Sequence, residues 1–324
     1  MSESSDYSPG VWKGHDFKSA KAAYAKVIDR GYGDAVAKGV DADSLVAESL
    51  VCEAQASLTI ITDVTGSMDE WPKTMFSKLP YLELETKQYL GENTEIGFAA
   101  VGDANSDKYP LQVCEYTSGL DLKTKMESLI IEGGGGGQDR ESYELAALYY
   151  ARNVTHPKAT HPILIIIGDE NYYDVISPDQ AKRYAKVILP ERITAKDVFD
   201  ELMRKYSVYL IRKPYGRTLG DKRSTADQHI HDSWVKLLGE DRIVTLPKAE
   251  RVVDVIFGIL AKETDRIPYF QMELEARQEA DKVDTVYKSL STVHIAAAAA
   301  LPAKAGHSTM RTTSLGEKTK SLLG

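Results

Sequence analysis

The feature that most constrains the fold is an alternation of strand-like and helix-like segments between residue 57 and about residue 265. The runs Leu58–Ile61, Glu95–Gly102 and Ile163–Ile167 are rich in apolar residues and predict buried strands. Segments with apolar residues at helical spacing lie between them, beginning with Pro72–Leu90. Strands that alternate with helices form a mostly parallel sheet covered by helices on both faces. The sequence therefore predicts an α/β fold with a doubly wound, Rossmann-like sheet.

The same periodicities predict the remaining elements of this region. Further helices are expected at Leu122–Ile130, Tyr143–Arg152, Pro178–Val187, Ala195–Tyr206, Gln228–Leu238 and Ala249–Lys262, and further strands at Leu111–Tyr116, Val208–Ile211 and Arg242–Leu246.

Three segments are expected along the chain. Residues 1–56 form a helical N-terminal extension, with a helix from Asp16 to about Arg30 that Gly31 and Gly33 stop, and a second helix across Asp43–Ala54. Residues 57–267 form the α/β domain. In residues 268–324, Pro268 breaks the preceding helix, a charged helix covers Met272–Leu290, and a tail rich in Ser, Thr, Lys and Gly is expected to be disordered.

Composition excludes several classes of protein. The 324 residues are 43% hydrophobic and 27% charged with a net charge of −8, a profile that disfavours a general nucleic-acid binder. The first residues lack the basic and apolar regions of a secretory signal, and no apolar stretch reaches the roughly 20 residues that span a bilayer. Cys52 and Cys114 lack metal-ligand spacing and are expected to be reduced thiols. We therefore expect a cytoplasmic protein that binds neither nucleic acid nor membrane.

Oxygen-bearing side chains follow two of the predicted strands. Asp63, Thr65 and Ser67 come directly after the first strand, and Asp169 follows the apolar run Ile163–Ile167. Doubly wound sheets bind ligands at the carboxyl ends of their strands. Carboxylates and hydroxyls without sulfur or imidazole suit Mg²⁺, Mn²⁺ or Ca²⁺ rather than Zn²⁺. These residues are therefore candidate ligands of a hard divalent cation.

The segment Asp63–Met68 resembles the D-x-S/T-x-S signature of the von Willebrand factor A (VWA) family. The resemblance extends over about Ser57–Glu263 and implies a metal-ion-dependent adhesion site, or MIDAS. In that family Thr65 and Ser67 would ligate the metal directly, while Asp63 and Asp169 would act partly through water.

One part of the sequence departs from the family pattern. The family's second loop, often glycine-rich, supplies a Thr, but no Thr follows the five glycines Gly133–Gly137. Gln138, Asp139 and Ser142 are the nearby alternatives, and Asp139 is chosen because similar VWA proteins place an acid there. The predicted metal ligands are thus Asp63, Thr65, Ser67, Asp139 and Asp169.

The resemblance also implies a function. VWA domains of this kind are non-catalytic modules that bind protein partners, and an Asp or Glu of the partner completes the coordination of the metal. The expected role is an adaptor or scaffold in an intracellular assembly, with an AAA+ ATPase as one kind of partner.

Three other interpretations remain. A haloacid-dehalogenase-like phosphohydrolase would use Asp63 as nucleophile and hold Mg²⁺ with Asp169 and Asp174, but Thr65 stands where that chemistry needs an acid. A nucleotide-binding loop at the glycine run would need Gly-Lys-Ser/Thr at its end, which is missing. The third is an α/β scaffold whose polar strand ends are only turns and helix caps.

Overall fold

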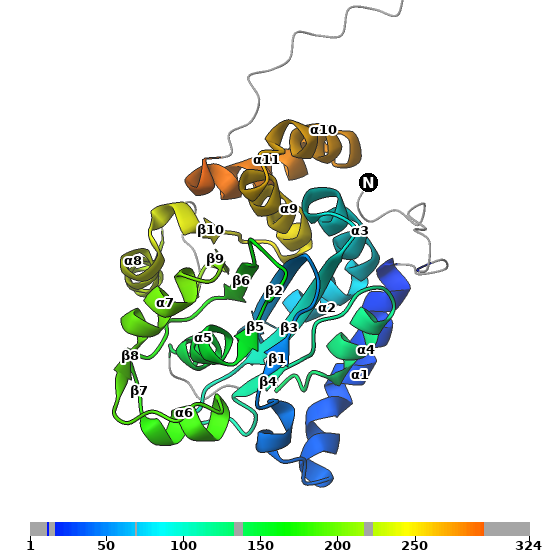
Figure 1. Ribbon diagram of the computed structural model, residues 1–324. Coiled ribbons are helices and arrows are strands. Elements are labelled where there is room, and N and C mark those ends of the chain that lie inside the picture. The colour runs from blue at the N-terminus through cyan, green and yellow to red at the C-terminus, as the bar shows by residue number, and fades with distance from the viewer. Residues whose placement is uncertain (1–11, 13–16, 69, 133–138, 217–222, 295–324) are drawn as a thin grey trace, which may run out of the picture.

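The computed structural model describes residues 12, 17–68, 70–132, 139–216 and 223–294 (Figure 1). The glycine run with Gln138, residues 217–222 and the C-terminal tail from residue 295 lie outside the described residues. The predictions made for those segments are therefore left as predictions.

A central sheet organises the described part of the chain. Its strand order is β10 (Ile243–Thr245), β9 (Ser207–Arg212), β6 (Ile163–Gly168), β2 (Ala56–Asp63), β3 (Thr94–Val101) and β4 (Leu111–Val113). Every neighbouring pair is parallel except β3 and β4. The chain leaves β2 toward β4 at one edge and returns through β6 toward β10 at the other, so the strand order reverses between β2 and β6. The predicted α/β doubly wound fold is confirmed.

Helices cover both faces of this sheet, as Figure 1 shows. One face carries α1 (Phe17–Ala37), α2 (Glu70–Ser77), α3 (Leu79–Leu90), α4 (Asp121–Ser128) and α9 (Val252–Glu263), and the other carries α5 (Tyr143–Arg152), α6 (Pro178–Tyr184), α7 (Ala195–Met203) and α8 (Thr225–Leu238). Successive residues of β6 alternate between the two hydrophobic cores. A strand buried on both faces needs apolar residues at every position, which explains the uninterrupted Ile163–Ile167 run.

The N-terminal segment differs from the prediction in two places. Helix α1 continues through Gly31 and Gly33 to Ala37, because Tyr32 packs edge-on against Tyr109 with ring centroids 6.0 Å apart and holds its last turns. The predicted helix over Asp43–Ala54 was wrong.

A short strand replaces that second helix. Residues Ala42–Leu45 form a single 3₁₀ turn, and β1 (Leu50–Val51) pairs in parallel with β5 (Val154–Thr155). Side chains from Leu50 to Ala54 alternate between buried and exposed, which is the period of a strand rather than a helix.

Prolines begin helices here rather than ending them. The single helix predicted over Pro72–Leu90 is divided into α2 and α3, with Pro80 in the first turn of α3, because proline lacks the N–H that would continue the helical hydrogen bonds. Pro268 likewise lies in the first turn of α10 (Ile267–Arg277), and α11 (Ala280–Leu290) follows separately.

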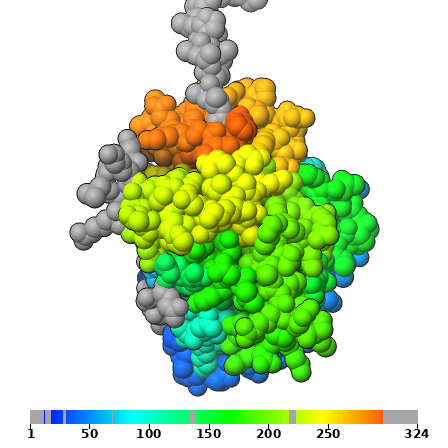
Figure 2. All heavy atoms as spheres, turned by 90° about the vertical axis from the view of Figure 1, so that its left-hand side faces the viewer, coloured from blue at the N-terminus to red at the C-terminus, as the bar shows by residue number. Residues whose placement is uncertain are grey.

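The C-terminal helices continue the core of the α/β domain. Phe270 of α10 and Leu290 of α11 belong to the same buried cluster as α9. Figure 2 shows these helices in orange, at the top of the molecule above the elements that cover the sheet. A short antiparallel pair, β7 (Val175–Ile176) with β8 (Ile193–Thr194), completes the described strands. None of the described helices combines the length and apolar character needed to cross a bilayer.

The packing of α1 predicts that the N-terminal extension stabilises the whole domain. Tyr24 of α1 is fully buried and stacks on Phe76 of α2 with ring centroids 4.1 Å apart. We expect Tyr24→Ala to lower the free energy of unfolding by about 3–5 kcal/mol, as other truncations of buried aromatic residues do. Val27→Ala on an exposed part of the same helix should change it by less than about 0.5 kcal/mol. Urea denaturation of both variants measures this, and equal effects would contradict an integral role for α1.

Candidate metal centre

The carboxylate of Asp63 organises the loop that follows β2. Asp63 is the last residue of the strand and has no solvent exposure. Its Oδ1 accepts hydrogen bonds from the backbone N–H of Thr65 at 2.8 Å and from the Thr65 hydroxyl at 2.6 Å. This bonding curls the chain back on the strand end, and the 3₁₀ turn Gly66–Met68 follows. The two hydroxyls predicted as ligands are thereby held beside the carboxylate.

Four of the five predicted ligands form one continuous chain of oxygen atoms. The Thr65 hydroxyl lies 3.3 Å from the Ser67 hydroxyl, which donates a 2.9 Å hydrogen bond to Oδ1 of Asp169. Asp169 follows β6, the strand beside β2, and is almost completely buried. Ser67 is exposed, so the chain of oxygens begins in the core at Asp63 and reaches solvent at Ser67.

The structure connects Asp139, the fifth predicted ligand, to this centre through its backbone. The Asp139 carbonyl accepts the N–H of Asn171 at 2.9 Å, which places the end of the glycine-rich loop beside the end of β6. The Asp139 side chain is exposed. Of the alternatives, Ser142 uses its hydroxyl to accept the backbone N–H of Ala104 at 2.9 Å, so its oxygen already holds the loop after β3.

Tyr143 is a further member of the centre that the sequence analysis missed. Its hydroxyl donates a 2.8 Å hydrogen bond to Oδ2 of Asp63, so both oxygens of that carboxylate are bonded. A Cβ atom on Gly168 would lie 2.0 Å from the Tyr143 hydroxyl oxygen, which explains why glycine precedes Asp169. The position of Tyr143 at the start of the predicted helix was the available signal, but a tyrosine there is equally typical of a core residue.

Two glutamates, the buried Glu141 and the half-buried Glu170, also lie near Asp63. Burial, followed by the charge of Asp169, raises the pKa of Asp63 to about 7. Burial and the charge of Asp63 raise the pKa of Glu170 to about 8 and that of Glu141 to about 11. Among the described residues, Oε2 of each glutamate is buried without a hydrogen-bond partner. Burial and neighbouring carboxylates therefore favour the protonated forms of these groups, and a cation beside them would favour the charged forms.

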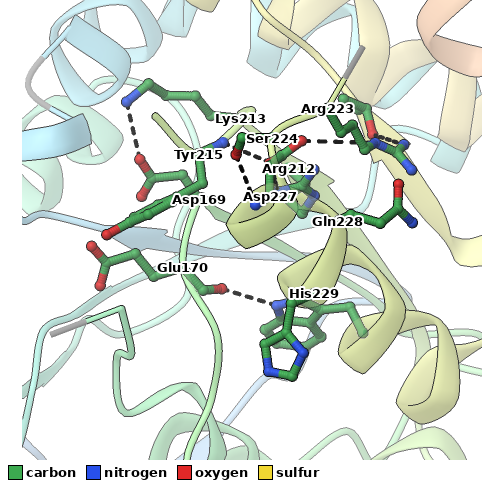
Figure 3. Close-up of polar contacts among 12 residues, drawn as sticks. Asp169, Glu170, Arg212, Lys213, Tyr215, Arg223, Ser224, Asp227, Gln228 and His229 are labelled. Carbon is green, nitrogen blue, oxygen red and sulfur yellow. Dashed lines mark hydrogen bonds and ion pairs between the residues drawn. The ribbon is translucent and has the colours of Figure 1, made fainter. Parts of the chain in front are cut away.

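Lys213 supplies a positive charge at the outer end of the centre (Figure 3). Its Nζ lies 3.0 Å from Oδ2 of Asp169 and donates a 2.6 Å hydrogen bond to the carbonyl oxygen of Ser67. Lys213 follows directly after β9, the strand beside β6. Lys213 was not among the residues predicted for this centre, although its position shortly after the predicted strand Val208–Ile211 was a usable signal.

The chemistry of the centre is that of hard oxygen donors. Two carboxylates and two hydroxyls come together from β2, its loop and the end of β6. Within the described ranges, no group of three or more His, Cys, Asp and Glu side chains is placed to hold a metal ion. A cation bound here would thus depend on the hydroxyls of Thr65 and Ser67.

The bonding of Asp63 predicts that Tyr143→Phe destabilises the protein. The substitution leaves a buried carboxylate oxygen without its donor, and we expect a loss of about 1–3 kcal/mol in the free energy of unfolding. Tyr150→Phe is the matched control, because Tyr150 is buried on the same helix and its hydroxyl has no partner among the described residues. Thermal or urea denaturation of the two variants gives the comparison, and an equal loss would contradict the structural role of the Tyr143 hydroxyl.

The raised carboxyl pKa values predict a pH dependence of stability in EDTA. Asp63 and Glu170 titrate near 7 and 8 in the folded protein, against ordinary values of 3.8 and 4.5. The folded protein therefore holds protons that the unfolded chain has released, and its stability falls as the pH rises from about 4.5 to 8. Asp63→Asn should make this dependence shallower, whereas Asp284→Asn on the exposed face of α11 should not. Denaturation curves across this pH range test the prediction, and parallel pH profiles for wild type and Asp63→Asn would refute it.

Comparisons with known proteins find only distant structural similarities. No protein-family model matches the chain, and no curated protein sequence matches it either. Two crystal structures of the pilus adhesin SpaC from Lactobacillus rhamnosus GG, one of them in an open conformation, align with this chain at 9% identity and TM-scores of 0.46. Both alignments cover 65% of this chain, and they cover 32% and 31% of the adhesin. Proximal thread matrix protein 1 from the mussel byssus aligns at 11% identity with a TM-score of 0.39, over 65% of this chain and 48% of that protein. The chain thus covers less than half the length of these proteins, and similarities this distant do not bear on its function.

Proposed function

We propose that this chain is a VWA-type protein-binding module whose binding surface is built around a divalent cation. The observation that carries the proposal is the hydrogen-bonded series from Asp63 through Thr65 and Ser67 to Asp169, which reaches solvent at Ser67. It lies where the strand order reverses between β2 and β6, the place where doubly wound sheets bind ligands. A scaffold whose polar strand ends are only turns would explain the bonds between Asp63 and Thr65, but not the further series through Ser67 to Asp169.

The donor set fits Mg²⁺, Mn²⁺ or Ca²⁺, which prefer carboxylate and hydroxyl oxygens. Thr65 and Ser67 would ligate the cation, and Asp63 and Asp169 would hold it directly or through water. Asp139 stays a candidate ligand because its backbone is fixed beside the end of β6. A cation at this place would also offset the negative charge of Asp63, which contributes to the raised pKa values of Glu141 and Glu170.

A cation held partly by neutral hydroxyls keeps an affinity for a further anionic oxygen. Ser67 is exposed, so an Asp or Glu of a partner protein can reach that end of the centre. We therefore propose an adaptor or scaffold role in an intracellular assembly, with a partner such as an AAA+ ATPase.

The phosphohydrolase alternative fits the geometry less well. A nucleophilic Asp63 would have to reach a substrate, yet its side chain is fully buried and both its oxygens accept hydrogen bonds. Asp174, which would help Asp169 to hold Mg²⁺, is 77% exposed and pairs with Arg140 at 3.3 Å. Mg²⁺-dependent hydrolysis of p-nitrophenyl phosphate that disappears in Asp63→Asn would nevertheless favour that alternative over ours.

The proposal predicts that metal binding depends on the Ser67 hydroxyl. We expect isothermal titration calorimetry to show one Mg²⁺ or Mn²⁺ bound per chain. Ser67→Ala removes a ligand without changing the charge, and it should weaken the affinity for the metal by about tenfold or more relative to wild type. Ser128→Ala is the control, because its hydroxyl contacts the Lys125 carbonyl and the Cys114 thiol and belongs to α4, which contributes no group to the centre. Equal affinities of wild type and Ser67→Ala would contradict the proposed ligand set.

The same variants test the partner. In a pull-down from the native lysate, wild type in Mg²⁺ should retain a protein that is lost in EDTA and lost with Ser67→Ala. A protein retained in all three conditions would place the binding surface elsewhere, for example on α10 and α11.

A further inference from the structure

The ion pair between Lys213 and Asp169 has a consequence for how the centre takes up metal. We propose that the Lys213 ammonium is an internal competitor of the divalent cation, so that metal binding exchanges one cation for the other at Asp169. This inference rests on the proposed function and concerns the regulation of the same centre.

The contacts of Lys213 lie on the two groups that flank the exposed end of the centre. Its Nζ lies 3.0 Å from one oxygen of Asp169, while the other oxygen accepts the Ser67 hydroxyl at 2.9 Å. The same Nζ donates to the Ser67 carbonyl oxygen at 2.6 Å. The ammonium thus bridges the side chain of one proposed ligand and the backbone of another.

The backbone of Lys213 is fixed, and therefore only its side chain can exchange. Its N–H donates to the Gly168 carbonyl at 2.9 Å. The preceding residue, Arg212, is fully buried and pairs at 2.6 Å with Asp227, which also accepts the N–H of Tyr215 at 2.7 Å (Figure 3). These bonds fix the chain on both sides of Lys213, and the fold therefore determines the position of the ammonium.

The ammonium and a divalent cation exclude each other at this place. Two positive charges that share one carboxylate repel strongly where water is scarce, and the Asp169 side chain is only 2% exposed. The displaced ammonium can move into an adjacent cavity. The Lys213 side chain is 29% exposed, and it lines a cavity of about 620 Å³ together with Ser67, Lys248 and Asp281. Its flexible stem can move the ammonium there without disturbing the core.

Competition of this kind lowers the apparent affinity for the metal. A protein whose binding-competent state is only partly populated binds more weakly by the fraction of that state. With Lys213 on Asp169 the centre keeps its shape without metal, and it binds metal only when the cation displaces the ammonium.

Calorimetric titration of the full chain with Mn²⁺ and with Mg²⁺ tests the exchange. We expect Lys213→Gln to bind either ion roughly ten- to a hundredfold more tightly than wild type, since a charge-assisted contact no longer has to be broken. Lys213→Arg, which keeps the competing charge, should stay close to wild type. Lys248→Gln is the matched control: it removes an exposed lysine that lines the same cavity, and it should change the affinity by less than about threefold because exposed charges are screened.

If Lys213→Gln does not bind the metal more tightly than wild type, or if Lys248→Gln tightens binding equally, the inference is overturned while the metal site remains. If neither wild type nor Lys213→Gln binds Mn²⁺ at millimolar concentration, the proposed function fails and the inference fails with it.

A second measurement uses the wild-type protein and so does not depend on how a variant folds. Reductive methylation followed by mass spectrometry reports how accessible each lysine amine is. Saturating Mg²⁺ should raise the labelling of Lys213, because the released ammonium moves into the cavity, and should leave Lys248 unchanged. Unchanged or reduced labelling of Lys213 in Mg²⁺ would overturn the exchange.

Discussion

The buried carboxylate of Asp63 is the interaction on which the arrangement of this centre depends. A charge without solvent is costly unless it is hydrogen-bonded, and here the loop after β2 donates twice through Thr65 while α5 donates through Tyr143. The register of the sheet then places the second carboxylate, that of Asp169, beside the first. Because Thr62 pairs with Ile167, Asp63 comes level with Gly168, and Asp169 follows one residue later. One carboxylate thus links a strand end, a turn, a helix and the neighbouring strand.

The balance of charge bears on both the stability of the centre and the proposed binding of a cation. Burial and the charge of Asp63 raise the pKa values of Glu141 and Glu170, and burial and the charge of Asp169 raise that of Asp63. Lys213 offsets part of the negative charge at Asp169. Under the exchange proposed above, the centre would fold before metal arrives, and a cation would bind only as well as it competes with the Lys213 ammonium. In this view, stability and metal uptake are two effects of one electrostatic arrangement.

The fold was largely predictable because its signals are local. Alternating apolar runs and helical spacing identified the strands of the central sheet and most helices around it. The errors occurred where distant contacts override local preference. Tyr109 holds α1 in helical form beyond Gly31 and Gly33, and pairing with β5 draws Leu50–Val51 into a strand. Neither partner is close in sequence, so local periodicity contains no trace of them.

The sequence by itself determined which residues form the chain of oxygen atoms in the centre. Asp63, Thr65 and Ser67 belong to one turn whose spacing brings their oxygens together, and Asp169 follows the most apolar strand. Only the tertiary structure decided which other side chains surround that chain of oxygen atoms. Glu141, Tyr143 and Lys213 reach it from other loops and helices, since strand order and register, which no local pattern encodes, decide which chain segments meet at the end of β2.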